Sequence, residues 1–202
     1  SSMDIRKRPN DEEKYTPKED GAFKRSKCRV QNWIDEKPEK DRYHLFVSFG
    51  CGWCHQVLIT LKLKGLQDII SVSHVGLHRI RDPKTGDYKG YCVPDDPTGN
   101  EFRSAFDVYN SNCRYGTTQM TIPILFDKKK KVVISNDPAH MLLMLNETFD
   151  NVAKNPTLNL YPKSKRVEIE NVNDIVFPGI NDGVYRCWFA QNTKVFEAQF
   201  QI

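Results

Sequence analysis

The chain has 202 residues, of which 39% are hydrophobic and 11% aromatic, and its 30 basic and 26 acidic residues leave a net charge of +4. This apolar content is sufficient for a packed core, which excludes a wholly disordered chain. No apolar run approaches the roughly 20 residues of a membrane-spanning helix, so we expect no membrane insertion. The N-terminus lacks an apolar signal segment, and six cysteines in such a chain are typical of reduced thiols, so we expect a cytoplasmic protein.

Residues 1–42 form the most polar part of the sequence, with 12 basic and 10 acidic residues. Such a segment buries too little apolar surface to offset its ordering entropy. We therefore expect a largely extended or disordered arm, whose later part packs on a neighbouring core near Phe23 and Trp33. The mixed signs of charge argue against a nucleic-acid-binding tail.

From residue 43 onward, apolar residues recur with strand and helix periodicity. Runs of aromatic and β-branched residues predict strands, whereas apolar residues three and four positions apart predict helices. Stretches rich in proline, glycine and charge predict loops. In chain order we expect a strand at 44–49, a helix at 54–66, a strand at 69–77, a loop at 78–100, a helix through 106–109, a hairpin at 121–135 and a helix at 138–149.

Local signals predict the ends of three of these helices. Gly65 lies near the end of the first helix, as a C-terminal cap would. Thr98 and Glu101 have the spacing of a capping box before the second helix. Asp137 and Pro138 supply an N-cap and a first-turn proline for the third.

The C-terminal part of the chain predicts only helices, at 163–176 and 184–201. The whole sequence therefore predicts four regions. They are a polar arm at 1–42, an α/β domain with the order β-α-β-α-β-β-α at 43–150, a linker at 151–162 and the start of an all-helical domain at 163–202.

The strongest functional signal is the pair Cys51 and Cys54, at the junction between the first strand and the first helix. Two cysteines three positions apart at a helix start lie on one face of the first turn. Unpaired N–H groups and the positive end of the helix dipole stabilise a thiolate there, so we expect a lowered pKa for Cys51. A strand that leads into C-x-x-C at a helix start is the thioredoxin-like arrangement, although two ordinary buried cysteines would also give this spacing.

Two metal-based interpretations use the same residues. The C-x-x-C pair and His55 match C-x-x-C-H, the c-type haem attachment pattern, which requires an exported or organellar setting and a second axial ligand. A zinc site needs two further ligands at matched spacing, whereas Cys92, Cys113 and His140 are scattered singly. We therefore expect no metal.

A second signal is Ile122 followed by Pro123 inside an apolar strand pattern. Proline within such a run is typical of an edge strand or of a cis peptide bond. In the thioredoxin fold, the residue before a cis-proline offers its backbone to the cysteinyl part of a thiol peptide. After a C-x-x-C and one β-α unit, this pair supports a thioredoxin-like fold.

Four segments of the chain carry a resemblance to one family. Residues 42–73, RYHLFVSFGCGWCHQVLITLKLKGLQDIISVS, resemble the segment RYHLYVS-x-x-CPWAHR-x-L-I-x-x-x-LKGLE-x-I-x-x-S of the Xi-class glutathione transferases, the S-glutathionyl-hydroquinone reductases. The other three are TIPILFD at 121–127, SNDPAHMLLMLNETFD at 135–150 and NDGVYRCWFAQNTKVFEAQ at 181–199. They are similar to the family's TVPVLWD, NNES-x-x-I-I-x-M-L-N-x-x-F and N-N-GVY-x-x-GFA-x-x-Q-x-x-Y.

The resemblance implies a thioredoxin-like domain that binds glutathione as co-substrate, followed by an all-helical domain. It implies that Cys51 is the catalytic cysteine and that Tyr185 belongs to the aromatic-substrate site. Cys54 would be an additional catalytic thiol. The implied glutathione-binding positions are Trp53, Tyr91, Gln119, Met120, Thr121, Ile122, Pro123 and Asp137.

Four positions depart from the family pattern. In its CPWA motif, Gly52 replaces proline, and Cys54 replaces alanine and so supplies a second thiol. Gln119 stands where a basic residue is usual. Pro138 replaces the serine that, with the preceding residue, holds the glutamyl end of glutathione. Because proline has neither a hydroxyl nor an N–H, we expect weakened glutathione binding.

Three functions are compatible with these residues. The first is a glutathione transferase that reduces glutathionyl-hydroquinones or mixed disulfides through a Cys51 thiolate and a glutathionylated-enzyme intermediate. The second is a dithiol oxidoreductase of the thioredoxin or glutaredoxin type that uses Cys51 and Cys54, and the third is a non-catalytic transferase-like scaffold. The expected partners are glutathione, a glutathionylated aromatic or thiol substrate and a second copy of the chain, because the last helices carry apolar residues that need cover; we expect neither nucleic acid nor membrane.

Overall fold

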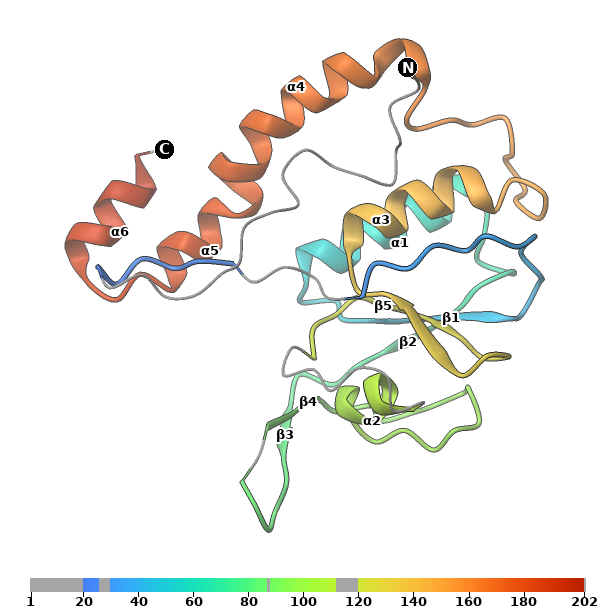
Figure 1. Ribbon diagram of the computed structural model, residues 1–202, viewed down its shortest axis with the longest axis horizontal. Helices are drawn as coiled ribbons and strands as arrows, with labels where there is room; N and C mark the ends of the chain where they lie inside the picture. Colours follow the sequence, from blue (N-terminus) through green and yellow to red (C-terminus); the bar gives the residue numbers. More distant parts are fainter. Residues whose placement is uncertain (1–19, 26–29, 87, 112–119, 202) are drawn as a thin grey trace. The chain divides into compact units, whose positions relative to one another are not determined.

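The computed structural model describes residues 20–25, 30–86, 88–111 and 120–201 (Figure 1). The chain divides into two compact units. One comprises residues 28–160 and carries the main β-sheet, and the other comprises residues 1–27 and 161–202 and is helical. We call them the thioredoxin-like unit and the helical unit. No helix among the described residues has the length and apolar character needed to cross a bilayer.

The thioredoxin-like unit is built on a mixed four-stranded sheet with the order β2-β1-β5-β6. β1 runs parallel to β2, whereas β1 and β5, and β5 and β6, are antiparallel. Phe46 in β1 lies opposite Ile124 in β5, so the segment after β1 and the segment before β5 meet at the same end of the sheet. The strands are β1 (Tyr43–Val47), β2 (Ser71–His74), β5 (Ile124–Asp127) and β6 (Val132–Ser135).

Helices lie on both faces of this sheet. α1 and α3 pack side by side on one face and α2 lies on the other (Figure 1). The predicted N-cap Asp137 and the predicted end of α1 at Gly65, which has φ 67°, are both confirmed. The helices are α1 (Gly52–Lys64), α2 (Ala105–Asn110), α3 (Pro138–Leu143) and the π-helical turn η1 (Met144–Thr148).

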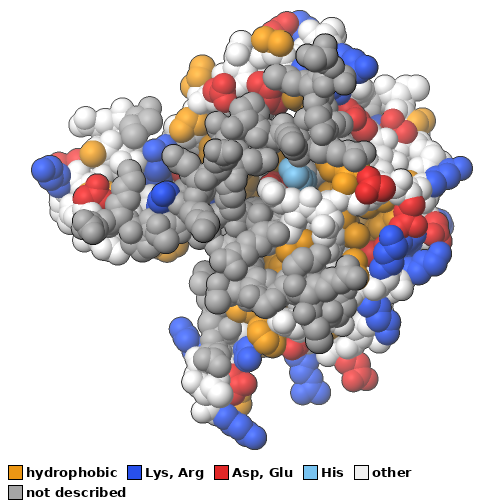
Figure 2. Space-filling model, in the orientation of Figure 1, with side chains coloured by type: hydrophobic (Ala, Val, Ile, Leu, Met, Phe, Trp, Pro, Cys, Tyr) orange, Lys and Arg blue, Asp and Glu red, His pale blue; other side chains and the backbone are white. Residues whose placement is uncertain are grey.

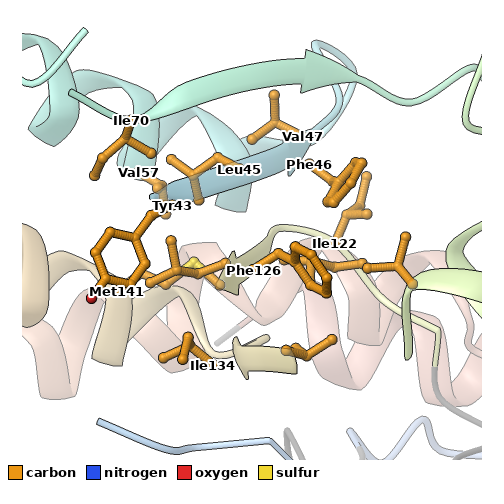
Figure 3. Close-up of a cluster of buried hydrophobic side chains, with 14 of the residues drawn as sticks. Tyr43, Leu45, Phe46, Val47, Val57, Ile70, Ile122, Phe126, Ile134 and Met141 are labelled. Atoms are coloured by element: carbon orange, nitrogen blue, oxygen red, sulfur yellow. The ribbon is translucent and has the colours of Figure 1, made fainter. Parts of the chain in front are cut away.

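The core of this unit lies between the sheet and its helices, where side chains of β1 and β5 meet Val57 of α1 and Met141 of α3 (Figure 3). All five residues of β1 are buried, because this central strand is covered on both faces. The rings of Phe46 and Phe126 meet edge to face with centroids 6.3 Å apart. Such aromatic pairs add about 0.5–1.5 kcal/mol to the stabilisation from buried area.

The described end of the polar arm joins the sheet. Gln31 forms an isolated bridge with Ser135, and the Asn32 N–H donates to the Ile134 carbonyl at 3.0 Å, so this segment pairs with β6. The half-buried Trp33 packs against the core, as the sequence predicted. Residues 1–19 and 26–29 of the arm lie outside the described residues.

Charged side chains of both signs lie next to one another on the face drawn in Figure 2. At the β5–β6 turn, Lys129 pairs with Glu39 at 3.0 Å, and both side chains are exposed. Beneath the turn, Arg42 donates to Asp127 at 2.6 Å, and both of these side chains are buried. Charged groups of the arm therefore neutralise groups of opposite charge at the turn and at the end of β5.

A hairpin interrupts the region 78–100, for which the prediction of a loop was wrong. Its strands are β3 (Arg79–Arg81) and β4 (Tyr88–Tyr91), and it projects from the main sheet (Figure 1). Asp82 accepts hydrogen bonds from the N–H groups of Lys84 and Thr85, and Gly86 has φ 75°, which closes the turn. Strands of three and four residues are too short to show a period in the sequence.

The start of α2 was also predicted at the wrong place. The capping box is formed by Ser104 and Asp107, since the Asp107 N–H donates to the Ser104 hydroxyl and the Ser104 N–H donates to the Asp107 carboxylate at 2.8 Å. Thr98 belongs to a preceding loop, in which Asp96 accepts its N–H at 2.9 Å. The Asp96 carboxylate thus takes the donor that the predicted box would have used.

The helical unit contains the predicted C-terminal helices, but the second one is broken. Residues 189–192 separate α5 from α6, because the Asn192 side chain accepts the Val195 N–H and starts a new helix. Phe23 of the arm stacks on Phe189 with ring centroids 5.0 Å apart. The elements are η2 (Lys163–Lys165), α4 (Arg166–Val176), η3 (Phe177–Asn181), α5 (Gly183–Trp188) and α6 (Thr193–Phe200).

Candidate active site

The junction between β1 and α1 places Cys51 at a helix N-terminus. The Cys51 N–H donates to the Ser48 carbonyl at 3.2 Å, which turns the chain after β1. Cys51 is extended, with φ −114° and ψ 111°, and its carbonyl accepts from the His55 N–H at 3.1 Å. This is the geometry of an N-cap residue, so the side chain of Cys51 lies at the positive end of the helix dipole.

The surroundings of Cys51 favour its thiolate. A hydrogen bond from the Cys54 thiol, together with the N–H groups of Cys54 and Trp53, lowers the pKa of Cys51 to about 6, although partial burial acts in the opposite direction. At neutral pH, Cys51 is therefore largely in its nucleophilic form.

Cys54 lies in the first turn of α1 and is fully buried. Its sulfur accepts the Ser48 N–H at 3.4 Å. The hydrogen bond to Cys51 and the burial of the side chain raise the pKa of Cys54 far above its usual range. Both cysteines are free thiols, so Cys54 serves as a proton donor to the Cys51 thiolate.

The second element of the predicted site lies at the same end of the sheet. The bond between Ile122 and Pro123 is cis, as the sequence predicted. This bond directly precedes β5, which pairs with β1, so the loop lies beside the segment that leads to Cys51. The Tyr109 hydroxyl donates to the Thr121 carbonyl at 2.7 Å and so anchors the loop to α2.

Strand β4 approaches this loop at a glycine. Gly90 has φ 80°, and a Cβ at this position would lie 2.9 Å from the Cβ atoms of Met120 and Ala105, so only glycine fits. The structure thereby brings the segment of Tyr91 against that of Met120. Gln119, another expected contact of glutathione, lies outside the described residues.

The carboxylate of Asp137 is engaged within the protein. One oxygen accepts the N–H groups of Ala139 at 2.8 Å and His140 at 3.4 Å, and the other accepts the Gln31 amide at 2.7 Å. Pro138 occupies the first position of α3 and contributes no N–H. The donors at this helix start are therefore used by Asp137 itself, and Gln31 is a neighbour that the sequence did not reveal.

Tyr185 belongs to α5 in the helical unit. The Arg25 guanidinium lies over its ring, 4.2 Å from the centroid, a distance typical of a cation–π contact. Arg25 also forms an ion pair with the buried Asp182, and the ring of Tyr185 stacks on Phe189. The arm segment at 20–25 thus holds the orientation of this tyrosine.

Comparison with known proteins assigns the chain to a family. A family model described as glutathione S-transferase, N-terminal domain, matches residues 50–148. The glutathionyl-hydroquinone reductase PcpF of Sphingobium chlorophenolicum is 35% identical over 182 residues, which cover 89% of this chain and 57% of that protein. The glutathione S-transferase Xi of Phanerochaete chrysosporium is 35% identical with a TM-score of 0.74, over 88% of this chain and 62% of that structure. The chain belongs to the Xi-class glutathione transferase family.

A further relative of this Xi-class chain was solved with glutathione bound. It is YqjG, a glutathione transferase homologue from Escherichia coli K-12, which is 32% identical with a TM-score of 0.68, over 80% of this chain and 52% of that one. The chain spans 57% of the length of the curated reductase and 62% of the Xi structure. The expected fold, a thioredoxin-like domain followed by a helical region, is confirmed.

Sequence reasoning missed an apolar rim beside the Xi-class cysteine. Phe49 is 69% exposed, and its ring stacks on His74 with centroids 3.6 Å apart. Leu77 is 77% exposed and lies 3.6 Å from where a Cβ on Gly50 would be. A large apolar residue, Phe49, lies two positions before Cys51 in the sequence, and this neighbourhood was the signal that could have revealed the rim.

The candidate metal ligands of this Xi-class chain are dispersed in the structure. Within the described ranges, no group of three or more His, Cys, Asp or Glu side chains could hold a metal ion. The backbone of Cys92 pairs with that of Ser104 in an isolated β-bridge, whereas His140 lies in α3. Cys113 is outside the described residues.

Proposed function

We propose that the protein is a glutathione-dependent reductase that removes the glutathionyl group from glutathionyl-hydroquinones or mixed disulfides through Cys51. The observation that carries this proposal is the Cys51 thiolate at the start of α1, beside the loop that ends in Pro123. A thiolate with a lowered pKa is the reactive form at neutral pH. The substrate class is supported by family membership, because a relative is named glutathionyl-hydroquinone reductase.

In the first step, the Cys51 thiolate attacks the sulfur of the glutathionyl group. The bond between that sulfur and the ring carbon breaks, the carbon takes a proton, and Cys51 becomes a mixed disulfide with glutathione. With a disulfide substrate, a thiolate leaves instead of the ring. A second glutathione thiolate then attacks the bound glutathionyl sulfur, which releases oxidised glutathione and restores Cys51. For the hydroquinone conjugate, the two electrons that reduce the ring carbon come from the sulfur of the transferred glutathionyl group and the sulfur of the second glutathione; with a disulfide substrate, the reaction is an exchange of one disulfide for another.

The proposal assigns separate roles to the two units. Within the thioredoxin-like unit, the proposed domain at 43–150 holds glutathione. A linker at 151–162 leads to the proposed helical domain, which begins at 163. This domain supplies Tyr185, which donates a proton or a hydrogen bond to the hydroquinone oxygen. Phe49 and Leu77 offer apolar contacts to the aromatic ring. The proposed glutathione contacts are Trp53, Tyr91, Gln119, Met120, Thr121, Ile122, Pro123 and Asp137.

The proposal includes a cytoplasmic homodimer. A reducing compartment suits the described cysteines, which are free thiols. A second copy of the chain would cover apolar side chains that are exposed on the helical unit, and contiguous exposed apolar patches are typical of protein–protein contacts. Light scattering across a dilution series tests this, and a monomer at every concentration contradicts it. These side chains are Val167, Val172, Ile175, Ile180, Val184, Trp188 and Phe200.

The test of the activity is turnover of 2-glutathionyl-hydroquinone with reduced glutathione, followed by chromatography of the released hydroquinone. We expect no release by Cys51→Ala, an unchanged rate for Cys92→Ala, which removes a free thiol outside the site, and a rate roughly 10²-fold lower for Tyr185→Phe if the tyrosine acts as an acid. Release by Cys51→Ala at the wild-type rate contradicts the mechanism. A wild-type protein that neither turns over nor binds glutathione would instead be the scaffold.

A further inference from the structure

The proposed cycle needs only one protein thiol, yet a second lies in contact with it. Cys54 is hydrogen-bonded to the Cys51 sulfur on one side and to the Ser48 N–H on the other, at 3.4 Å. It is fully buried, so thiols and disulfides in solution cannot reach it. Any exchange chemistry of Cys54 must therefore pass through Cys51.

The backbone at the start of α1 suits a bond between these two sulfurs. Cys51 is the extended N-cap and Cys54 is the third residue of the helix, so both lie in the first turn. Two helical residues three positions apart have Cβ atoms about 5–6 Å apart, whereas a disulfide bridges Cβ atoms about 3.5–4.5 Å apart; the extended φ and ψ of Cys51 take it out of this helical spacing. Because the two thiols already hydrogen-bond, a bond between their sulfurs needs an adjustment only within this first turn.

The charge of Cys51 controls the reactivity of Cys54. The hydrogen bond to Cys51 and the repulsion from its negative charge both raise the pKa of Cys54. When Cys51 carries a glutathionyl group, its sulfur is neutral and both of these effects are lost. Burial then opposes ionisation of Cys54, whereas the Ser48 N–H favours it. Glutathionylation of Cys51 is thus the event that frees Cys54 to act as a nucleophile.

We propose that Cys54 is the resolving cysteine, which displaces glutathione from Cys51 and leaves an internal disulfide; this rests on the proposed function because it needs the glutathionylated intermediate. The Cys54 sulfur bonds to the Cys51 sulfur, the bond between Cys51 and glutathione breaks, and the leaving glutathione takes up the proton of Cys54. One disulfide replaces another, so the step involves no net oxidation. Two further glutathione molecules reduce the internal disulfide, restore both thiols and leave as oxidised glutathione.

Resolution by Cys54 competes with resolution by free glutathione. Intramolecular reactions of well-oriented groups reach effective molarities of about 10⁵ M or more, far above any concentration of glutathione in an assay. The glutathionylated form of the wild-type protein should therefore be short-lived, and the internal disulfide should be the form that accumulates when reduced glutathione is absent.

The experiment is incubation of the reduced protein with oxidised glutathione, followed by acid quenching, alkylation of free thiols and mass spectrometry of intact protein and peptides. Wild-type protein is expected to lose two hydrogens within the peptide that contains Cys51 and Cys54. Cys54→Ala is expected to retain one glutathionyl group on Cys51. Cys92→Ala is the matched control, since it removes a free thiol outside the pair, and it should behave as wild type.

The outcomes separate this inference from the proposed function. If wild-type protein keeps the glutathionyl group on Cys51 to the same extent as Cys54→Ala, the resolving role is overturned and the proposed function stands. If Cys54→Ala takes up no glutathionyl group on Cys51, both this inference and the proposed function are overturned. Cys54→Ser serves as a second variant, and the fate of the wild-type protein decides the question even if a variant folds poorly.

Discussion

The two units of this chain place similar apolar residues in opposite surroundings. Every residue of β1 is buried, whereas α4 and α6 contain no buried residue. Phe126 in β5 is fully buried, while Phe200 in α6 is 74% exposed. Amphipathic periodicity therefore predicts that a helix forms, but burial depends on a second surface that receives its apolar face.

The chemistry is divided between the units in a similar way. The thiol pair depends on local geometry at the start of α1, within the thioredoxin-like unit. Tyr185 depends on contacts with the arm, in particular with Arg25. We therefore expect substitutions in the thioredoxin-like unit to alter stability and thiol reactivity most, and substitutions in the helical unit to act on assembly and on the aromatic substrate.

The largest expected difference in stability comes from one phenylalanine in each unit. Phe126→Ala removes a side chain that meets Phe102 edge to face, with centroids 5.5 Å apart, and should lower the free energy of unfolding by about 3–5 kcal/mol. Phe200→Ala should change it by less than about 0.5 kcal/mol, because that ring is mostly in water. Urea unfolding at low protein concentration measures both. Equal costs would mean that the helical unit is packed as tightly as the sheet.

Ion pairs in the two units should also differ in their contribution to the free energy of unfolding, by a smaller amount than the two phenylalanines. Arg42→Met leaves the buried carboxylate of Asp127 without its guanidinium partner, at a cost of about 3 kcal/mol. Glu168→Gln breaks an exposed pair with Lys165 in the helical unit, where solvent screens the charges, and should cost less than about 0.5 kcal/mol. The same urea titration reports both values, and a cost for Glu168→Gln as large as that for Arg42→Met would reject the comparison.

The titration of Cys51 tests the local origin of its reactivity. The alkylation rate of Cys51, followed in its own peptide, should rise with pH through a midpoint at about 6 and then level off, because the thiolate is the reacting species. Cys54→Ala should move the midpoint upward, since it removes the hydrogen bond that lowers the pKa of Cys51 most. Tyr185→Phe in the other unit should leave it unchanged. A wild-type midpoint near the usual value of about 8.5 would contradict this account.

The features that could be predicted from the sequence are those with local signals. The Asp137–Pro138 helix start, the glycine cap at Gly65 and the C-x-x-C at the first helix each depend on a few adjacent residues. The cis bond before Pro123 was predicted from a proline that interrupts an apolar run. These signals were sufficient for the order of elements in the main sheet.

The features that were missed depend on contacts between distant residues or on competing local bonds. The β3–β4 hairpin has strands too short to show a period. Thr98 lost its capping role because Asp96 takes its N–H. The contact of Gln31 with Asp137 joins residues that are 106 positions apart, so no local pattern reveals it.

The smallest expected effect is on the affinity for glutathione. It tests whether the thioredoxin-like unit alone determines this affinity. Asp137 already accepts the N–H groups of Ala139 and His140, and Pro138 has none to offer, so the start of α3 has little to hold the charged glutamyl end of glutathione. Pro138→Ser adds an N–H and a hydroxyl there, and a net gain of about 1 kcal/mol would tighten binding roughly five-fold.

Calorimetry with reduced glutathione on a Cys51→Ala background measures this gain without disulfide chemistry. Pro138→Ala adds the N–H alone and should give an intermediate affinity, which separates the two new donors. Tyr185→Phe should leave the affinity unchanged, because the proposed glutathione contacts all lie in the thioredoxin-like unit. If Pro138→Ser has no effect while Tyr185→Phe weakens binding, the helical unit takes part in holding glutathione. The division of labour between the two units would then be wrong, since the site would need both of them to bind its co-substrate.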